Sequence, residues 1–197
     1  MTEPPFSPLH FEQFEDADSS PVVTAYHGTL VEHAHKIVDE QRVLPSTNSY
    51  DWLGHGAYFW EGSPLRALQW AEHDRDDPAH EVAVVKARIN LGACLDLIDS
   101  RYETLPIEAE RRFKVTEGAA GRELPTNKGK LRRLDCAVFN YLCQNVDLPI
   151  DTIRALYSEG VPAYDSANLY TRSHIHLCVR NPVCVLTLSI FDGPFKL

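Results

Sequence analysis

"GHGAYFWE", residues 54–61, sets two glycines directly before three consecutive large aromatic residues. Glycine lets a chain turn sharply and approach another group closely, whereas Tyr58, Phe59 and Trp60 favour an extended strand. Successive side chains of a strand point to opposite faces, so Phe59 is expected in the core, with Tyr58 on the other face. The stretch therefore predicts a short strand, 57–60, that offers an aromatic wall to a planar ligand.

The whole chain has the composition of a folded, acidic protein. It has 197 residues, of which 44% are hydrophobic and 24% charged, with a formal net charge of -9. This length suits one domain with a sizeable core. The negative charge disfavours a general attraction to nucleic acid or to an anionic membrane. A local basic cluster is nevertheless present at Lys128, Lys130, Arg132 and Arg133.

The cysteines and the N-terminal segment indicate the compartment. The five cysteines include no Cys-x-x-Cys pair, which is typical of buried thiols in a reducing compartment. The first residues lack the basic and apolar regions of a signal peptide, and no stretch approaches the ~20 apolar residues of a membrane helix. We therefore expect a cytoplasmic protein without membrane contact.

The first 21 residues, with four prolines and an acidic run, predict an extended arm before one folded domain, 22–197. Its apolar residues are expected to dock on the domain or on a partner; they are Phe6, Leu9, Phe11 and Phe14.

Periodicity along the domain predicts strands at 22–28, 57–60, 81–89, 174–180 and 183–191, the last two as a pair. A helix is expected after a capping box of Thr29 and Glu32, another from Ser63 and Pro64, and two more at 102–115 and 130–145. Asp151 is expected to cap a short helix that ends at Tyr157, with a loop at 158–173. This order indicates an α+β fold with a mainly antiparallel sheet.

Two histidine pairs, His33 with His35 and His174 with His176, raise the question of metal binding. His174 and His176 share one face of a strand, about 6.6 Å apart along the backbone, and could chelate a metal. No third ligand stands at a suitable spacing, so no metal is expected. A metal-dependent hydrolase remains a rival interpretation.

His27-Gly28-Thr29 at the end of a strand, followed about thirty residues later by Gly-x-Gly-x-Tyr-Phe, resembles the ADP-ribosyltransferase superfamily. The similarity is greatest to the histidine–tyrosine branch, which includes diphtheria toxin and the poly(ADP-ribose) polymerases, and "GHGAYFWEGSPLRALQWA" looks like its bacterial toxin-type members. It covers about residues 22 to 191. The resemblance implies a catalytic domain with a split, mainly antiparallel sheet surrounded by helices.

The resemblance also implies NAD⁺ as co-substrate and assigns roles to particular residues. Tyr58 would stack on the nicotinamide ring, and Trp70 would flank its other side. Gly28 would offer its backbone N–H and C=O to the amide, at a distance that only glycine permits. His27 would bind the ribose on the adenosine side, with help from Thr29.

One position departs from the family's pattern. Where the branch has a catalytic glutamate, this chain reads "RSHIHLC", so that His174 aligns with it and His176 shares its face. A neutral histidine supplies no fixed negative charge for an oxocarbenium-like transition state. Glu159 or Glu61 could swing in instead. Elongation into poly(ADP-ribose) is therefore disfavoured, and transfer of one unit is favoured.

The loop 158–173 corresponds to the place where the family recognises its acceptor. Tyr164 and Tyr170 are expected to stack on a base and Arg172 to pair with phosphate, with the basic cluster beside them if the acceptor is nucleic acid.

Together these features predict a mono-ADP-ribosyltransferase that acts on a macromolecular acceptor, RNA, DNA or protein. It would be a bacterial toxin or anti-phage defence effector with a neutralising antitoxin partner. The alternatives are a catalytically silent module that binds NAD⁺ or ADP-ribose, and an NAD⁺ glycohydrolase.

Overall fold

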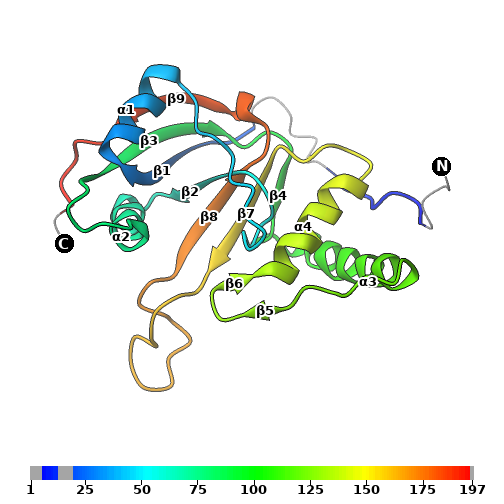
Figure 1. Cartoon of the computed structure of the whole chain (residues 1–197). Coiled ribbons are helices and arrows are strands. Elements are labelled where there is room, and N and C mark those ends of the chain that lie inside the picture. The colour runs from blue at the N-terminus through cyan, green and yellow to red at the C-terminus, as the bar shows by residue number, and fades with distance from the viewer. Residues whose placement is uncertain (1–5, 13–19, 196–197) are drawn as a thin grey trace.

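A mainly antiparallel sheet organises the molecule (Figure 1). The computed structural model describes residues 6–12 and 20–195, and within them seven strands form this sheet in the order β4-β7-β8-β2-β1-β3-β9. The pair β4 and β7 is parallel and the other pairs are antiparallel. The strands are β1 (Val22–Leu30), β2 (Ala57–Glu61), β3 (Val82–Asn90), β4 (Cys94–Asp96), β7 (Thr152–Tyr157), β8 (His174–Val179) and β9 (Val185–Ile190).

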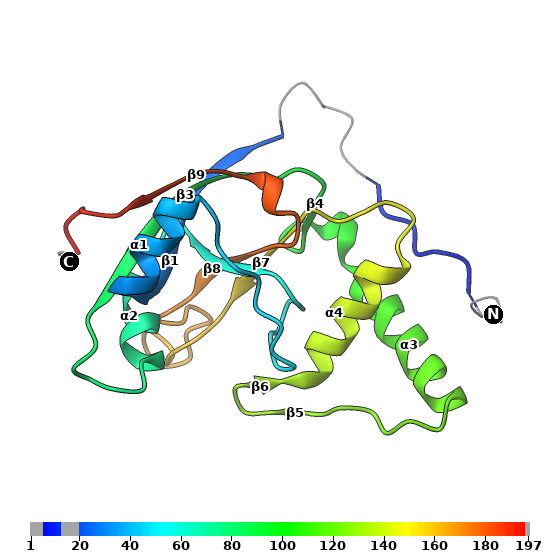
Figure 2. The ribbon, with the colours of Figure 1, turned by 45° about the horizontal axis from the view of Figure 1, so that its top comes forward.

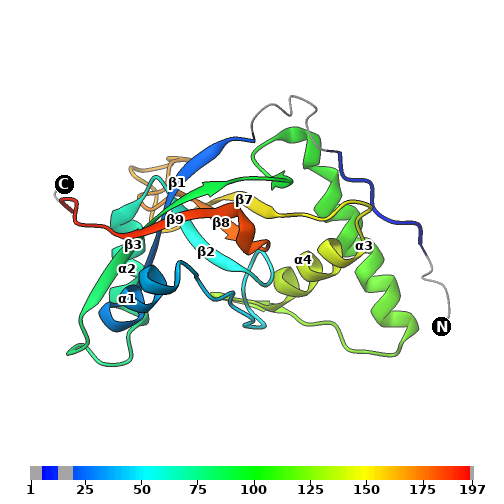
Figure 3. The same cartoon turned by 90° about the horizontal axis from the view of Figure 1, so that it is seen from above.

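Helices cover the two ends of the sheet (Figure 2, Figure 3). They are α1 (Val31–Glu40), α2 (Pro64–Asp74), α3 (Thr104–Ala119) and α4 (Arg133–Asn145). A small hairpin of β5 (Asn127–Lys128) and β6 (Leu131–Arg132) precedes α4, and short 3₁₀ turns lie at Ser100–Tyr102 and Pro182–Cys184. In all three views α1 and α2 lie at one end of the sheet and α3 and α4 at the other. The predicted α+β fold is confirmed.

Both faces of the sheet contribute to the core, because alternate side chains of each strand point to opposite sides. Phe59 is fully buried, as predicted, and packs with Ala34 of α1 and Val85 of β3. The neighbouring Trp60 packs on the other face with Ala67 of α2. On that second face α3 and α4 cover the opposite end, which leaves the middle of the face between α2 and α4 without a covering helix.

The sheet has little strand pairing between its central strands β1 and β2. Among the described residues, β1 and β2 are joined by two register pairs, Ala25 with Glu61 and Tyr26 with Trp60. By contrast, β1 pairs with β3 along nine positions and β2 with β8 along five. The sheet therefore consists of two well-paired halves, β4-β7-β8-β2 and β1-β3-β9, which separate beyond Tyr26.

The predicted capping box at Thr29 is wrong. β1 runs through Thr29, which lies opposite Ala83, and ends at Leu30. Helix α1 begins directly after it without a side-chain cap, and the N–H of Val31 binds the carbonyl of Glu81 at 3.0 Å instead. Continued pairing with β3 supplies hydrogen-bond partners for the backbone here, so no side-chain cap forms at Thr29.

The helix predicted after Asp151 is also wrong, because Thr152–Tyr157 is strand β7 in the interior of the sheet. Asp151 instead binds the N–H of Ala93 at 2.9 Å and the amide of Asn181 at 2.8 Å. β8 and β9 were expected to pair, but β2, β1 and β3 lie between them. Strand pairing between distant segments decides both outcomes, and local sequence carries little of that information.

Part of the N-terminal arm belongs to the core. Leu9 and Phe11 are 2% and 1% exposed and pack in the cluster that includes α3 and α4. Leu9 bridges to Val146, and the ring of Phe6 lies against two arginines of α3. Phe14 lies outside the described residues. The docking expected for this arm is therefore seen at residues 6–12, as core packing.

Candidate functional site

A cleft of about 310 Å³ lies over the uncovered middle of the sheet, a volume typical of small-molecule sites. Its walls come from β2, β7, β8, the exposed side of α2, the β5–β6 hairpin and the loop before β2. Aromatic side chains dominate these walls, contributed by Tyr50, Trp52, Tyr58, Trp60, Trp70 and Tyr157. The rings of Trp60 and Trp70 lie 5.7 Å apart. The cleft can therefore hold a flat, partly apolar ligand.

His27 and Tyr58 both line this cleft, at the place where β1 and β2 separate. Nδ1 of His27 lies 2.9 Å from the carbonyl oxygen of Tyr58. A carbonyl can only accept, so Nδ1 carries the proton. Burial lowers the pKa of His27 and keeps the ring neutral. Nε2 is then an unprotonated acceptor, suited to a hydroxyl group of a ligand.

The backbone polar groups of Gly28 face the opening between β1 and β2. The carbonyl of Val84 accepts the N–H of Phe191 at 2.8 Å, so the polar groups of Val84 face β9. Opposite residues in an antiparallel ladder alternate between hydrogen-bonded and non-hydrogen-bonded pairs. Gly28 lies opposite Val84 and therefore directs its N–H and C=O away from β3, toward β2.

The reason for glycine at position 28 differs from the predicted one. A Cβ atom there would lie 1.8 Å from the carbonyl oxygen of Ala67 in α2. The missing side chain thus lets helix α2 pack directly on β1, and we correct the expectation that it makes room for a ligand. Gly28 is buried and lies outside the residues that line the cleft.

The hydroxyl of Tyr58 holds the loop in front of it. It donates to the carbonyl of Gly54 at 2.7 Å and accepts the N–H of Leu53 at 3.0 Å. Burial raises the pKa of this hydroxyl above its ordinary value. The phenol is thus neutral and structurally engaged, and its ring is the part available to a ligand.

A hydrogen-bonded chain runs through the two histidines of β8. Nε1 of Trp52 donates to Nδ1 of His176 at 2.9 Å, the two Nε2 atoms of His176 and His174 lie 3.1 Å apart, and Nδ1 of His174 lies 2.7 Å from the carbonyl of Arg172. An indole can only donate and a carbonyl can only accept. One proton therefore lies between the rings, donated by His176, and both imidazoles are neutral.

The surroundings favour this neutral state. His174 and His176 are 7% and 9% exposed. Burial is the main cause that lowers the pKa of His174 and holds that of His176 well below its ordinary value, and the charge of Arg66 acts in the same direction. The position expected to hold a catalytic glutamate thus carries no charge.

Glu159 is the predicted acid that the structure brings to the cleft. It lines the cleft and binds Arg66 of α2 at 2.5 Å. Glu61, the other predicted acid, binds Arg154 through two hydrogen bonds of 2.6 and 2.9 Å. Because β2 extends through Glu61, its side chain faces the side opposite to Trp60. The predicted catalytic role of Glu61 is therefore replaced by a structural ion pair.

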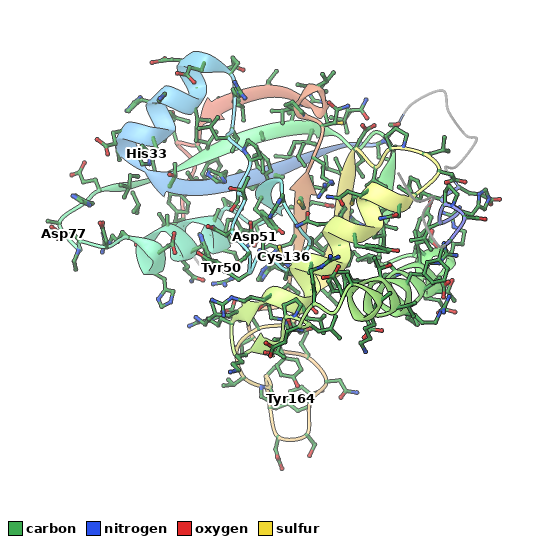
Figure 4. The ribbon with its side chains drawn as sticks, turned by 45° about the vertical axis from the view of Figure 1, so that its right-hand side comes forward. His33, Tyr50, Asp51, Asp77, Cys136 and Tyr164 are labelled. Carbon is green, nitrogen blue, oxygen red and sulfur yellow. The ribbon has the colours of Figure 1, made fainter. Side chains whose placement is uncertain are left out.

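Buried polar atoms without a partner gather at the cleft. Among the described residues these are Oδ2 of Asp51, Nε1 of Trp60 and Nε of Arg66, and all three residues line the cleft. Burial also raises the pKa of Asp51, which lies beside Cys136 (Figure 4). Unpaired buried groups cost free energy, so a ligand that pairs with them would bind favourably.

The other predicted residues lie at varying distances from this site. Trp70 lines the cleft, whereas Thr29 does not. Arg172 lines a neighbouring pocket. Tyr164 and Tyr170 are 69% and 39% exposed in the loop after β7, outside the cleft.

Sequence patterns missed several cleft residues. Tyr50, Asp51 and Trp52 stand in a segment interpreted only as a loop, and Tyr157 was assigned to a helix. The one local signal was the pair of aromatics around Asp51, directly before the glycines that open the motif.

The structure gives little support to a metal site. Within the described residues no group of three or more His, Cys, Asp or Glu is placed to hold a metal ion. His174 and His176 use their facing nitrogens for each other. Nor is any helix in the described part of the chain long and apolar enough to cross a membrane.

Comparison with known proteins finds a distant relative. The chain is 28% identical over 196 residues to the uncharacterized protein MJ0359 of Methanocaldococcus jannaschii, an alignment that covers 86% of this chain and 87% of that protein. No family model matches the chain.

Proposed function

We propose that the cleft binds NAD⁺ and that the protein transfers its ADP-ribose unit to a macromolecular acceptor. The observation that carries this proposal is the shared position of His27 and Tyr58 in one cleft, at the opening between β1 and β2. The two residues were expected to act together from sequence motifs about thirty positions apart. A cleft with aromatic walls and a neutral imidazole acceptor suits a nicotinamide and a ribose.

The residues present fit two parts of NAD⁺, the nicotinamide and the ribose on the adenosine side. The ring of Tyr58 offers a face for the pyridine ring, a contact worth about 0.5–1.5 kcal/mol. Gly28 does not line the cleft, but its N–H and C=O face the opening between β1 and β2, where they would match the donor and acceptor of a carboxamide that enters this opening. Nε2 of His27 can accept a hydrogen bond from a ribose hydroxyl.

The chemistry requires the bond between ribose C1′ and the nicotinamide nitrogen to break. Nicotinamide leaves with the bonding electrons, and positive charge develops on the ribose. The acceptor nucleophile then forms the new bond to C1′ and releases its proton to water. Glu159 is the acid we assign to stabilise this charge, with Arg66 holding its carboxylate in place. His174 is neutral and serves to position the loop that carries Glu159.

One observation favours a second candidate, an NAD⁺-binding module without catalysis. The position of the usual glutamate holds a neutral histidine, and the charge of Glu159 is partly offset by Arg66. Such a module would bind NAD⁺ without releasing nicotinamide. A glycohydrolase, in contrast, would release nicotinamide with no acceptor present.

Incubation with NAD⁺ labelled in its adenine ring decides among these functions. Release of nicotinamide and transfer of label to lysate macromolecules support the transferase, release without transfer supports the glycohydrolase, and binding without release supports the module. Absence of NAD⁺ binding in calorimetry would overturn the proposal.

The variant that tests the aromatic wall is Tyr58→Ala. Loss of the stack should weaken NAD⁺ binding by about 2- to 12-fold. Tyr164→Ala is the matched control, because this exposed ring lies outside the cleft and its removal should leave NAD⁺ affinity unchanged. Equal effects of the two variants would count against the assigned site.

A further inference from the structure

A second pocket of about 370 Å³ adjoins the cleft on the side of the loop after β7. It shares Arg66, Trp70, Lys130 and Glu159 with the cleft, and it adds His73 of α2 and Arg172 of the loop. A ligand that occupies this pocket would therefore lie directly beside Glu159, where the proposed transfer takes place.

The second pocket carries a net positive charge, because three cations and two carboxylates line it. Arg66 is paired with Glu159. Within the described residues, however, no carboxylate lies at ion-pair distance from Lys130 or Arg172, and the ammonium of Lys130 is 3.4 Å from Nε2 of His73. Glu72 is the remaining acid on its wall. Lys130 and Arg172, two cations without a carboxylate partner in the described part of the chain, thus line one pocket of a chain whose net charge is -9, and they suit phosphate groups.

One aromatic ring lines this pocket, and two more are exposed on the loop after β7. Trp70 forms part of the wall and is 42% exposed, and Tyr170 is 39% exposed two residues before Arg172. Tyr164, 69% exposed, lies on the loop below the β5–β6 hairpin (Figure 4). Cations combined with exposed aromatic rings are typical of surfaces that bind single strands, because phosphates pair with the cations and unpaired bases stack on the rings.

We propose that this second pocket binds two neighbouring phosphates of single-stranded nucleic acid, and that such a strand is the acceptor of the transfer. This inference names the substrate of the proposed function and therefore rests on it. Lys130 and Arg172 each hold one of these phosphates, and the tyrosines of the loop stack on neighbouring bases. The strand's attacking group then lies on the Glu159 side of the cleft.

The charge distribution favours a single strand over a duplex or a protein. A duplex needs an extended basic surface, whereas this pocket offers three cations, Arg66, Lys130 and Arg172, on an acidic chain. Stacking also needs bases that are not paired. A protein acceptor would use neither the rings nor the pair of free cations in this way.

The test measures binding of a fluorescein-labelled single strand of about ten nucleotides, within the range of site sizes of single-strand binders, by anisotropy and without NAD⁺. Two phosphate contacts at about 0.7 each give a salt slope of about -1.4. Affinity should then fall by about sevenfold between 50 and 200 mM salt, because a fourfold increase in salt, raised to the power 1.4, gives about seven. The duplex of the same sequence should bind more weakly.

Lys130→Ala and Arg172→Ala should each reduce the salt slope by about 0.7, and the double variant should remove most of it. Lys128→Ala is the matched control, because Lys128 is an exposed lysine of the same hairpin that lines neither pocket. Circular dichroism and the melting temperature verify that each variant is folded.

Three outcomes would overturn the inference. They are absence of strand binding by the folded wild-type protein, equal loss with Lys128→Ala, and transfer of label from NAD⁺ to protein alone. A loss of NAD⁺ affinity in Arg172→Ala without any strand binding would instead assign the pocket to the dinucleotide. Strand binding by a protein that does not bind NAD⁺ would leave this site standing and refute the proposed transferase.

Discussion

Lowering the pH from 7.5 to 5.5 should reduce the free energy of unfolding by up to about 2.7 kcal/mol through His174 and His176. Burial lowers the pKa of both imidazoles in the folded protein, while in the unfolded chain both return to about 6.5. The unfolded state then binds more protons below pH 6.5, so the stability that is present above this value is lost as the pH falls. Over these two pH units each imidazole contributes about 1.4 kcal/mol if it stays neutral when folded.

The hydrogen-bond chain gives the physical reason for this resistance to protonation. A further proton on Nε2 of His174 would point at the N–H of His176 across 3.1 Å. The indole of Trp52 can only donate a hydrogen bond and the carbonyl of Arg172 can only accept one, so neither partner can relieve this conflict.

Urea unfolding at pH 7.5, 6.5 and 5.5 measures the effect, with the fluorescence of the cleft tryptophans as the signal. The double variant His174→Gln, His176→Gln should lose the share of the pH dependence that these two residues contribute, whatever its absolute stability. His27, whose pKa burial also lowers, should keep its own share. His33→Gln, an exposed site on α1 (Figure 4), is the matched control and should keep it. An unchanged slope in the double variant would refute the assignment of two neutral imidazoles.

Three further outcomes are expected. Gly28→Ala should lower the free energy of unfolding by at least about 1–3 kcal/mol in urea titrations, because its Cβ would meet the carbonyl of Ala67 at 1.8 Å; wild-type stability would contradict the direct packing of α2 on β1. Tyr58→Phe should cost about 1–3 kcal/mol of stability, since it leaves the N–H of Leu53 unpaired, and should weaken NAD⁺ binding less than Tyr58→Ala in calorimetry. Glu159→Gln should slow nicotinamide release by about 10²–10³ with little change in the dissociation constant for NAD⁺; an unchanged rate would remove Glu159 from the chemistry.

Sequence predicted well those features that depend on neighbouring residues. The alternation in 57–60 correctly assigned Phe59 to the core, and Pro64 marked the first residue of α2. The strand at 81–89 agrees with β3 to within a residue. The α+β class follows from such local signals, because they fix the order of helices and strands.

Features that depend on distant contacts were harder to predict. Thr152–Tyr157 is a strand because β4 and β8 pair with it from both sides, and no nearby residue signals this. The same holds for the cleft, where motif residues meet side chains from the loop at 44–52 and from the β5–β6 hairpin. His27 and Tyr58 were identified from a motif, whereas Trp52 required the fold.

The short seam between β1 and β2, where two register pairs join the half-sheets, has a mechanical consequence. Its few pairs make it the place where the two half-sheets can part most easily, and amide hydrogens there should exchange earliest among the central strands. A ligand that contacts His27 on one half-sheet and Tyr58 on the other would hold the two halves together across this seam. Occupancy would then make the two halves melt together, so that a calorimetric scan could reveal a bound molecule before its chemistry is known.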